Sequence, residues 1–189
     1  MTYALTNLII QENKRTNIAI LQSTHRKGMD NVIHYLNDSG FFIIPSSLHR
    51  HHNWCGGLAQ HSLGVYMTAS ENSENLPIDS VIIACLLHDI CKAGKYYYYD
   101  SVGNIHQRLV HIHGHGYRSV KLLEKCGLIL TEDERRAIRW HMGGHHANDK
   151  DIEDVTIARN IKLWKVVHEA DQWDARGKNL NNSTLMNTE

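Results

Sequence analysis

Three features of this 189-residue sequence predict an all-α fold with one small β insertion. Only two prolines are present, so long helices can form with few forced breaks. Apolar residues recur at spacings of three and four in several segments. Helix start and stop signals flank many of those segments. The length suits a single domain with a substantial core.

The domain organisation follows from the composition along the chain. We expect one helical domain over residues 1–177, with N-terminal helices in residues 1–40 and a core in residues 41–175. Residues 178–189 are polar and rich in asparagine, and they predict a frayed C-terminal tail. No internal repeat or linker divides the chain.

The most apolar segment predicts the central helix of the bundle. Residues 56–70 predict a helix that comes before it. Pro77 then fits a first helical turn, Val81–Ile90 is apolar on nearly all sides, and Gly94 stands where a helix would stop. A helix that is apolar all round is usually buried, so we expect this one at the centre.

A β-hairpin is expected next, and helices are expected after it. Residues 95–112 contain four consecutive tyrosines, a turn-prone SVGN and a second mixed apolar run, which predict a hairpin. Residues 114–125 predict a helix, and Thr131 and Glu134 form a capping-box pattern that opens another. Residues 152–175 place apolar side chains at helical spacing and predict one long amphipathic helix.

The charge balance argues against a nucleic-acid or membrane partner. Twenty basic residues match 20 acidic ones and the pI is near 7.3, so there is no basic footprint for duplex nucleic acid or an anionic membrane. No apolar run approaches the length of a membrane span, and the N-terminus lacks a signal-peptide pattern. The four cysteines form no CxxC pair, which predicts reduced, buried thiols in a cytoplasmic protein. A homo-oligomer is compatible with the sequence.

The histidines carry the chemical signal. The chain has 15 of them, so the single His-Asp pair in LLHDICK has no meaning by itself. Histidines and aspartates recur, however, once per predicted helical segment. The recurring groups are His61, His88, Asp89, His115, His141 and Asp171. From His61 to His88, Asp89 to His115, His115 to His141 and His141 to Asp171 the separations are 27, 26, 26 and 30 residues.

This regular interval predicts a shared site in the bundle core. A helix, a loop and the next helix take about that length, so each helix can deliver one side chain to a common point. Four imidazoles and two carboxylates suit one or two divalent transition metals, and without metal such groups are costly to bury. The ions compatible with this set are Fe, Mn, Co, Ni or Zn, with Mg also possible. Cysteine-based zinc patterns are absent, which argues against a structural zinc finger.

Several positions have neighbours that compete for the same role. A lone histidine on an apolar face is usually a hydrogen-bonded core residue, so the choice rests on the whole set. His113 competes with His115, and we favour His115 because glycines flank it. His145 and His146 compete with His141, which follows an apolar helical run. The further neighbours are His168, one turn before Asp171, and Asp174, which we expect behind the site or in solvent.

Taken together, these motifs resemble the HD-domain superfamily of metal-dependent phosphohydrolases, over about Phe41 to Asp174. The family pattern of His, His-Asp and a distant Asp matches His61, His88, Asp89 and Asp171. A dinuclear subset adds two histidines, which GHGYRSV and AIRWHMGGHH supply as His115 and His141. HHNWCGGLAQHSLGVY is similar to a segment of HD hydrolases related to a bacterial exoribonuclease. The resemblance implies an HD-domain helical bundle.

The resemblance also implies roles for these groups and a reaction. Asp89 would bridge two metals, with His61, His88 and Asp171 on one and His115 and His141 on the other. Such metals would lower the pKa of bound water and supply hydroxide to attack a phosphate ester. The expected substrate is a nucleotide or another small phosphorylated metabolite.

Basic residues near the motifs are candidates for substrate binding. Lys92 follows Asp89 by one helical turn, so its ammonium can reach a phosphate oxygen and take part in catalysis with Asp89. Arg50, His51 and His52 in LHRHHNW, and Arg118 after the glycines, are candidates to line the phosphate pocket.

Two other functions are alternatives, and the first uses the same six ligands. One is a dinuclear iron oxygenase of the HD-like type, which the lysine does not exclude. The other is a regulatory, ligand-binding HD module, against which the six intact ligand candidates argue.

Overall fold

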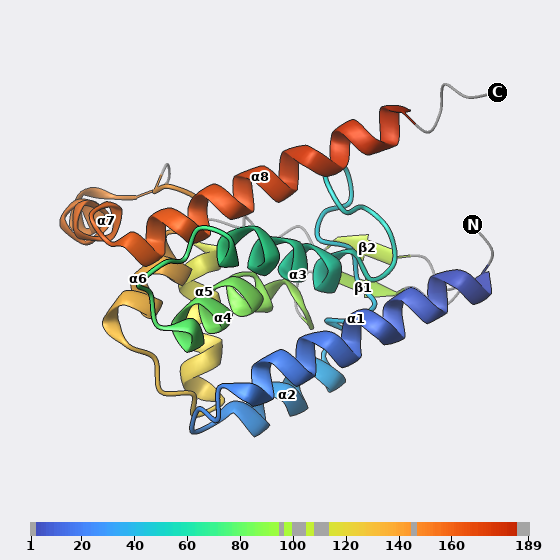
Figure 1. Cartoon of the computed structure of the whole chain (residues 1–189), viewed down its shortest axis with the longest axis horizontal. Helices are drawn as coiled ribbons and strands as arrows, with labels where there is room; N and C mark the ends of the chain where they lie inside the picture. Colours follow the sequence, from blue (N-terminus) through green and yellow to red (C-terminus); the bar gives the residue numbers. More distant parts are fainter. Residues whose placement is uncertain (1–2, 95–96, 100–104, 108–113, 145–146, 185–189) are drawn as a thin grey trace.

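The fold is an α-helical bundle with a two-stranded sheet at one end (Figure 1). The computed structural model describes residues 3–94, 97–99, 105–107, 114–144 and 147–184. The α-helices are α1 (Tyr3–Ser23), α2 (Met29–Asp38), α3 (Gly57–Ser70), α4 (Ile78–Leu87), α5 (His115–Lys125), α6 (Glu132–Arg139), α7 (Ile152–Arg159) and α8 (Lys162–Thr184). Two short 3-10 turns are η1 (Ile90–Lys92) and η2 (Asp149–Asp151). The all-α class and the helices predicted over 56–70 and 114–125 are confirmed.

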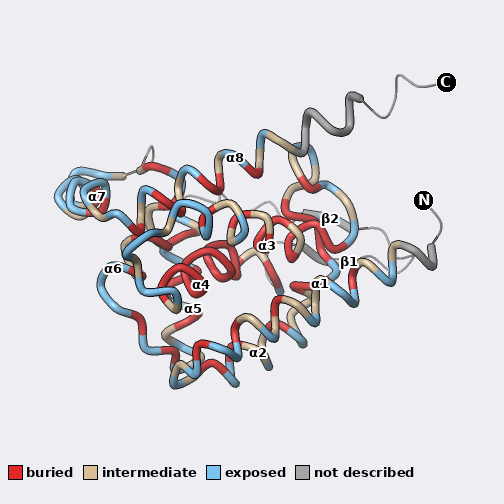
Figure 2. The backbone as a smooth tube through the Cα atoms, in the orientation of Figure 1, coloured by how far each residue is buried: buried red, intermediate tan, exposed pale blue. Residues whose placement is uncertain are grey.

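Helix α4 is the central helix, as its apolar sequence predicts. Every residue from Ser80 to Leu87 is buried, and the tube through α4 is red in the middle of Figure 2. The helix packs against α1, α3, α6 and α8. Because α4 is surrounded on all sides, side chains at its C-terminal end can meet side chains from several other helices.

The predicted extent of this helix was wrong at its C-terminal end. It was expected to stop at Gly94, but α4 ends at Leu87 and the chain turns through η1. In a continuing α-helix the Cys91 N–H would bond to the Leu87 carbonyl. It donates instead to Ser119 Oγ of α5, at 3.3 Å. The His-Asp pair therefore lies at a helix end.

The capping box predicted at the start of α6 is present. The Glu134 N–H donates to Thr131 Oγ1 (3.2 Å), and the Thr131 N–H donates to Glu134 Oε2 (2.8 Å). The Glu134 carboxylate is fully buried and also accepts hydrogen bonds from Arg26 and from Ser80 Oγ. This cluster fixes α6 to α4 and to the α1–α2 connection.

The single helix predicted over residues 152–175 is two helices. Asn160 ends α7: its N–H bonds to Ile157 O and its Nδ2 donates to Thr156 O, both at 3.0 Å. An asparagine side chain that bonds the local backbone in this way competes with helix continuation. Helix α8 then continues to Thr184, beyond the point where we expected the polar tail to begin.

The predicted hairpin is present in the described residues. Strands β1 (Tyr97–Tyr99) and β2 (Ile105–Gln107) pair antiparallel, with Tyr98 opposite His106. The remaining residues of the predicted 95–112 segment lie outside the described part of the chain.

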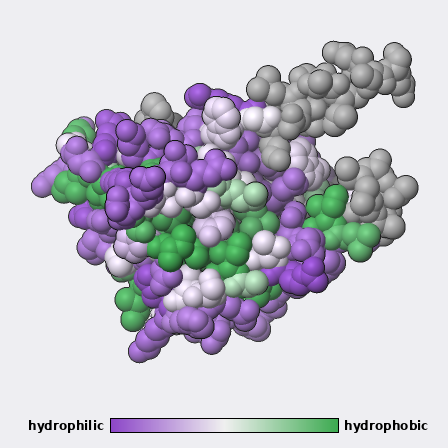
Figure 3. All heavy atoms as spheres, in the orientation of Figure 1, coloured by the Kyte–Doolittle hydropathy of each residue, from purple (hydrophilic) through white to green (hydrophobic). Residues whose placement is uncertain are grey.

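The surface agrees with the balanced composition. Hydrophilic side chains cover the rim of the face in Figure 3, and apolar side chains gather near its middle. Among the described residues, no helix combines the length and apolar character required to cross a membrane. All four cysteines are free: Cys85 and Cys91 are buried, whereas Cys55 is exposed, contrary to the prediction of buried thiols.

Candidate metal centre

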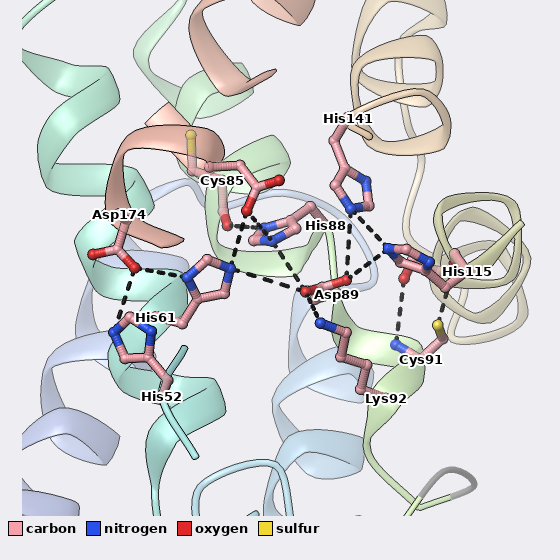
Figure 4. A network of polar contacts seen from close by, with 12 residues as sticks. His52, His61, Cys85, His88, Asp89, Cys91, Lys92, His115, His141 and Asp174 are labelled. Atoms are coloured by element: carbon pink, nitrogen blue, oxygen red, sulfur yellow. Dashed lines mark hydrogen bonds and ion pairs between the residues drawn. The ribbon is translucent and has the colours of Figure 1, made fainter. Parts of the chain in front are cut away.

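The six groups singled out from the sequence lie together around the C-terminal end of α4 (Figure 4). His61 comes from the middle of α3, and Asp171 comes from α8. His88 caps α4, and Asp89 begins the turn that follows it. The remaining two are His115, the first residue of α5, and His141, which follows α6. Five of the six are buried, and His115 is partly exposed.

Asp89 lies at the centre and divides its carboxylate oxygens between two pairs of histidines. Its Oδ2 is 3.3 Å from His88 Nε2 and 4.0 Å from His61 Nε2. Its Oδ1 is 3.4 Å from His115 Nε2 and 3.6 Å from His141 Nε2. A carboxylate in this position can bridge two cations, one on each side.

The donor atoms on each side are spaced as ligands of one ion are. On one side His61 Nε2 is 3.1 Å and His88 Nε2 is 3.9 Å from Asp171 Oδ1. On the other side, His115 Nε2 and His141 Nε2 are 3.1 Å apart. Two ligands bound at about 2.1 Å with angles of about 90 to 120° are separated by roughly 3.0 to 3.6 Å. Most of the observed separations fall in or near that range.

Hydrogen bonds behind three of the histidines direct their Nε2 atoms into the centre. His88 Nδ1 is 2.8 Å from Cys85 O, and His141 Nδ1 is 2.8 Å from Ile138 O. A carbonyl can only accept, so both Nδ1 atoms carry hydrogen and both Nε2 atoms present a lone pair. His61 Nδ1–H donates to Asp174 Oδ2 at 2.7 Å. This pattern is typical of histidines that bind metal through Nε2.

The centre also contains buried polar atoms that the protein does not satisfy. In the part of the chain that the structure describes, His61 Nε2, His88 Nε2 and Asp89 Oδ1 have no hydrogen-bond partner. Leaving such atoms unpaired in the interior is costly. A cation bound among them removes that cost, so the residues present fit a metal site.

The charges in the centre also favour a cation. Burial alone would lower the pKa of His61, but the carboxylates of Asp171 and Asp174 outweigh it and raise that pKa to about 9. Burial would raise the pKa of Asp89, but the Lys92 ammonium and the neighbouring His88 ring outweigh it and hold that pKa well below its usual range. Asp89 is therefore ionised at neutral pH, and a proton on His61 occupies a place that a metal would take.

The family comparison agrees with this geometry. The chain matches the HD domain family over residues 58–175, which is more than half of its length. The chain belongs to the HD domain family. No curated protein and no solved structure matched the chain. Members of this family are mostly metal-dependent phosphohydrolases, so family membership indicates metal-dependent, hydrolase-type activity in general.

In this HD domain a glycine explains how His115 and His141 meet. Helix α5 crosses the C-terminal end of α6 at Gly116, where an added Cβ would lie 2.3 Å from Arg139 O. Any side chain at this position would push the two helices apart. The GHG sequence therefore allows the close approach that brings the two imidazoles within 3.1 Å.

Lys92 reaches the centre of the HD domain from η1. Its Nζ lies 2.6 Å from Asp89 Oδ2, and its side chain is 16% exposed, as is that of His115. His51 is also partly buried, with its ring centroid 4.7 Å from that of His61. Burial, together with the positive charges of His61 and Lys92, lowers the pKa of His51 to about 4, so it is neutral at pH 7. These three residues mark the more accessible side of the centre.

The other residues predicted to bind substrate lie in different places. Arg50 and Arg118 are exposed, and their roles stay predictions. His52 is fully buried on the Nδ1 side of His61, where its Nε2 lies 3.4 Å from Asp174 Oδ2. It contacts Asp174, which holds His61 from behind, and lies away from the ring nitrogens that converge on Asp89 (Figure 4).

Of the four histidines that compete with the predicted ligands, the described part of the chain contains His168. His168 donates a hydrogen bond through Nδ1 to His141 O and stacks on Trp164, with its ring centroid 4.8 Å from that of the indole. His113, His145 and His146 lie outside the described residues. Asp174 is buried behind His61, which is the first of the two places expected for it, and its spacing of three from Asp171 places both on one face of α8.

Proposed function

We propose that this HD domain is a phosphohydrolase that binds two divalent transition-metal ions and cleaves a phosphate ester of a nucleotide or another small metabolite. The observation that carries the proposal is the division of the Asp89 oxygens between two histidine pairs. One ion would be held by His61, His88, Asp89 and Asp171, and the other by Asp89, His115 and His141. When bound, such ions lower the pKa of a water molecule and stabilise negative charge on phosphoryl oxygens.

The protein groups favour an anionic substrate once the metals are bound. Two divalent ions with two carboxylates and four neutral imidazoles leave a charge of about +2 in a buried site. Lys92 adds a further positive charge at the accessible side, 2.6 Å from Asp89 Oδ2. A phosphate group matches this excess of positive charge, and the Lys92 ammonium can donate to one of its nonbridging oxygens.

Metal analysis and a phosphate-release screen test the proposal. The purified protein is analysed for metal, stripped with a chelator, and reloaded separately with Mn, Fe, Co, Ni, Zn or Mg. Each form is assayed on nucleotides, phosphomonoesters and phosphodiesters. We expect hydrolysis that depends on added metal, and loss of metal and activity in His88→Ala and Asp89→Asn, because both residues lie in the buried centre.

His34→Ala is the matched control, since the His34 side chain is 80% exposed on α2. It should keep wild-type metal content and activity. Full activity in Asp89→Asn would contradict the proposed site. Oxygen consumption by the reduced, iron-loaded protein, without phosphate release from any substrate, would instead support the oxygenase alternative. A purified protein without detectable metal would support a regulatory module.

A further inference from the structure

His61 differs from the other two supported histidines in what holds its Nδ1 atom. His88 and His141 donate to backbone carbonyls, whereas His61 donates to the Asp174 carboxylate at 2.7 Å. A charged acceptor forms a stronger hydrogen bond than a carbonyl and makes the ring a more basic ligand. The support of His61 is therefore a side chain that mutation can remove.

The Asp174 carboxylate is held between α8, α3 and the loop before α3. It is only 7% exposed. Helix α3 has Gly64 where it passes Asp174, and an added Cβ there would lie 2.0 Å from Asp174 Oδ1. From the loop of residues 45–56, His52 places Nε2 at 3.4 Å from Asp174 Oδ2. The same oxygen thus faces His61 and His52.

His52 adopts a conformation that needs strong support from its surroundings. Its φ is 51°, in the left-handed region that residues with a side chain seldom adopt. The side chain is fully buried, and the ring packs on Trp54 and His61 at centroid distances of 5.0 and 5.2 Å. The His52 carbonyl accepts from the Ser46 N–H at 3.1 Å. Strained residues of this kind cluster at functional sites.

Donor and acceptor roles can be assigned consistently from His61 through Asp174 and His52 to His51. His61 Nδ1–H donates to Asp174 Oδ2, whereas His52 Nε2 approaches the same oxygen at 3.4 Å without meeting hydrogen-bond geometry; the tautomer with hydrogen on Nε2 leaves His52 Nδ1 as an acceptor. His51 Nδ1 lies 3.2 Å from that atom and can donate to it. Ring nitrogens of His51, His52 and His61 lie close enough together to hold a metal ion. The contacts with Asp174 and between the rings account for this cluster without a further ion.

We propose that Asp174 and His52 form a positioning pair, which orients His61 toward the metal centre and ties that ligand to the loop carrying Arg50 and His51. The inference rests on the proposed metal centre, because His61 is oriented there as a ligand. Neither member of the pair touches the ions or the substrate. Its consequence is that the affinity for metal depends on residues outside the ligand set.

Zn²⁺ affinity, measured by competition with a chromophoric chelator, tests the pair in the full-length protein. Asp174→Asn keeps the shape of the side chain and removes its charge, so we expect the affinity to fall about 10- to 100-fold. Leu and Gln both have an unbranched Cβ, so His52→Leu and His52→Gln should bear the left-handed backbone conformation equally well. Only Gln keeps an N–H donor. His52→Leu should weaken Zn²⁺ binding in the same direction, and His52→Gln should restore most of it.

Glu169→Gln is the matched control, because it makes the same change of carboxylate to amide on α8, at a side chain that is 63% exposed. It should bind Zn²⁺ as the wild type does. Wild-type affinity in Asp174→Asn, or equal affinity in the two His52 variants, would overturn the positioning pair. A wild-type protein that binds Zn²⁺ but hydrolyses no phosphate ester would overturn the proposed function alone. A wild-type protein that binds no Zn²⁺ would overturn both.

Discussion

At the scale of single residues, the Asp89–Lys92 contact would connect metal binding to binding of the proposed phosphate substrate. Lys92 Nζ is 2.6 Å from Asp89 Oδ2, the oxygen that faces His61 and His88. The ammonium therefore competes with a cation for this carboxylate oxygen. It also brings a positive charge to the more accessible side of the centre. Removal of Lys92 should therefore favour metal binding but weaken the attraction for an anionic substrate.

Lys92→Met should consequently separate metal binding from hydrolysis. We expect the variant to keep its full metal content, with affinity equal to or above that of the wild type, because a competing positive charge is gone. The value of kcat/KM should fall, and the fall should correspond to a loss of about 1–3 kcal/mol of transition-state stabilisation, the range for a charge-assisted hydrogen bond. Metal analysis and steady-state kinetics on the best phosphate substrate measure both. An unchanged kcat/KM would make Lys92 a structural residue.

At the scale of elements, Asp154 joins α7 to the end of α6. Its carboxylate accepts from Arg136 Nε and Trp140 Nε1, both at 2.8 Å, and from Arg139 Nη1 at 3.2 Å. Burial would raise the pKa of Asp154, but the hydrogen bonds from Trp140 and Arg136 outweigh it and lower that pKa. His141 directly follows Trp140, so this junction also supports the placement of a proposed ligand.

The pH dependence of this junction has a defined sign. A carboxyl group with a lower pKa in the folded state stabilises the fold above its unfolded pKa of about 3.9. That contribution is lost as pH falls through the folded pKa, since protonation then favours the unfolded chain. Asp154→Asn should lower the stability at pH 7 by about 1 kcal/mol, given that the site is partly exposed. The difference from wild type should shrink as pH falls below the unfolded pKa.

Thermal unfolding of the metal-free proteins at several pH values measures this effect. Asp149→Asn is the control, because Asp149 is an exposed carboxylate of the neighbouring η2 turn. A difference between Asp154→Asn and wild type that stays constant with pH would show that the carboxylate charge is unimportant.

At the scale of the whole molecule, the candidate centre joins helices that are distant in sequence. The six groups come from α3, the end of α4, the start of α5, the end of α6 and α8. Metal bound among them should stabilise the folded bundle, because ligands that bind only the folded state add about 2.7 kcal/mol at 100 times Kd. Removal of metal should lower Tm, and readdition should restore it.

Metal stoichiometry separates a one-ion centre from a two-ion centre. The double variant His115→Ala/His141→Ala removes both histidines on the Oδ1 side of Asp89 and leaves His61, His88 and Asp171 in place. We expect it to bind one ion where the wild type binds two, to retain part of the metal-dependent rise in Tm, and to lose most hydrolysis. Equal metal content in the variant and the wild type would leave only the site around His61 and His88.

The sequence by itself determined the helical class, the central position of α4, the hairpin and six of the residues that meet. These follow from local chemistry: apolar periodicity, capping residues, and polar groups that recur in an apolar context once per helix. Because those signals are local, they do not require knowledge of how the helices pack.

Tertiary structure alone decided where α4 stops and what supports the centre. Helix α4 ends at Leu87 because Ser119 of another helix takes the Cys91 N–H, and no local signal marks that exchange. His52 was expected to line a phosphate pocket, yet it is buried beside Asp174, which is distant in the sequence. Contacts between distant segments depend on helix packing, which the periodicity of one segment does not encode.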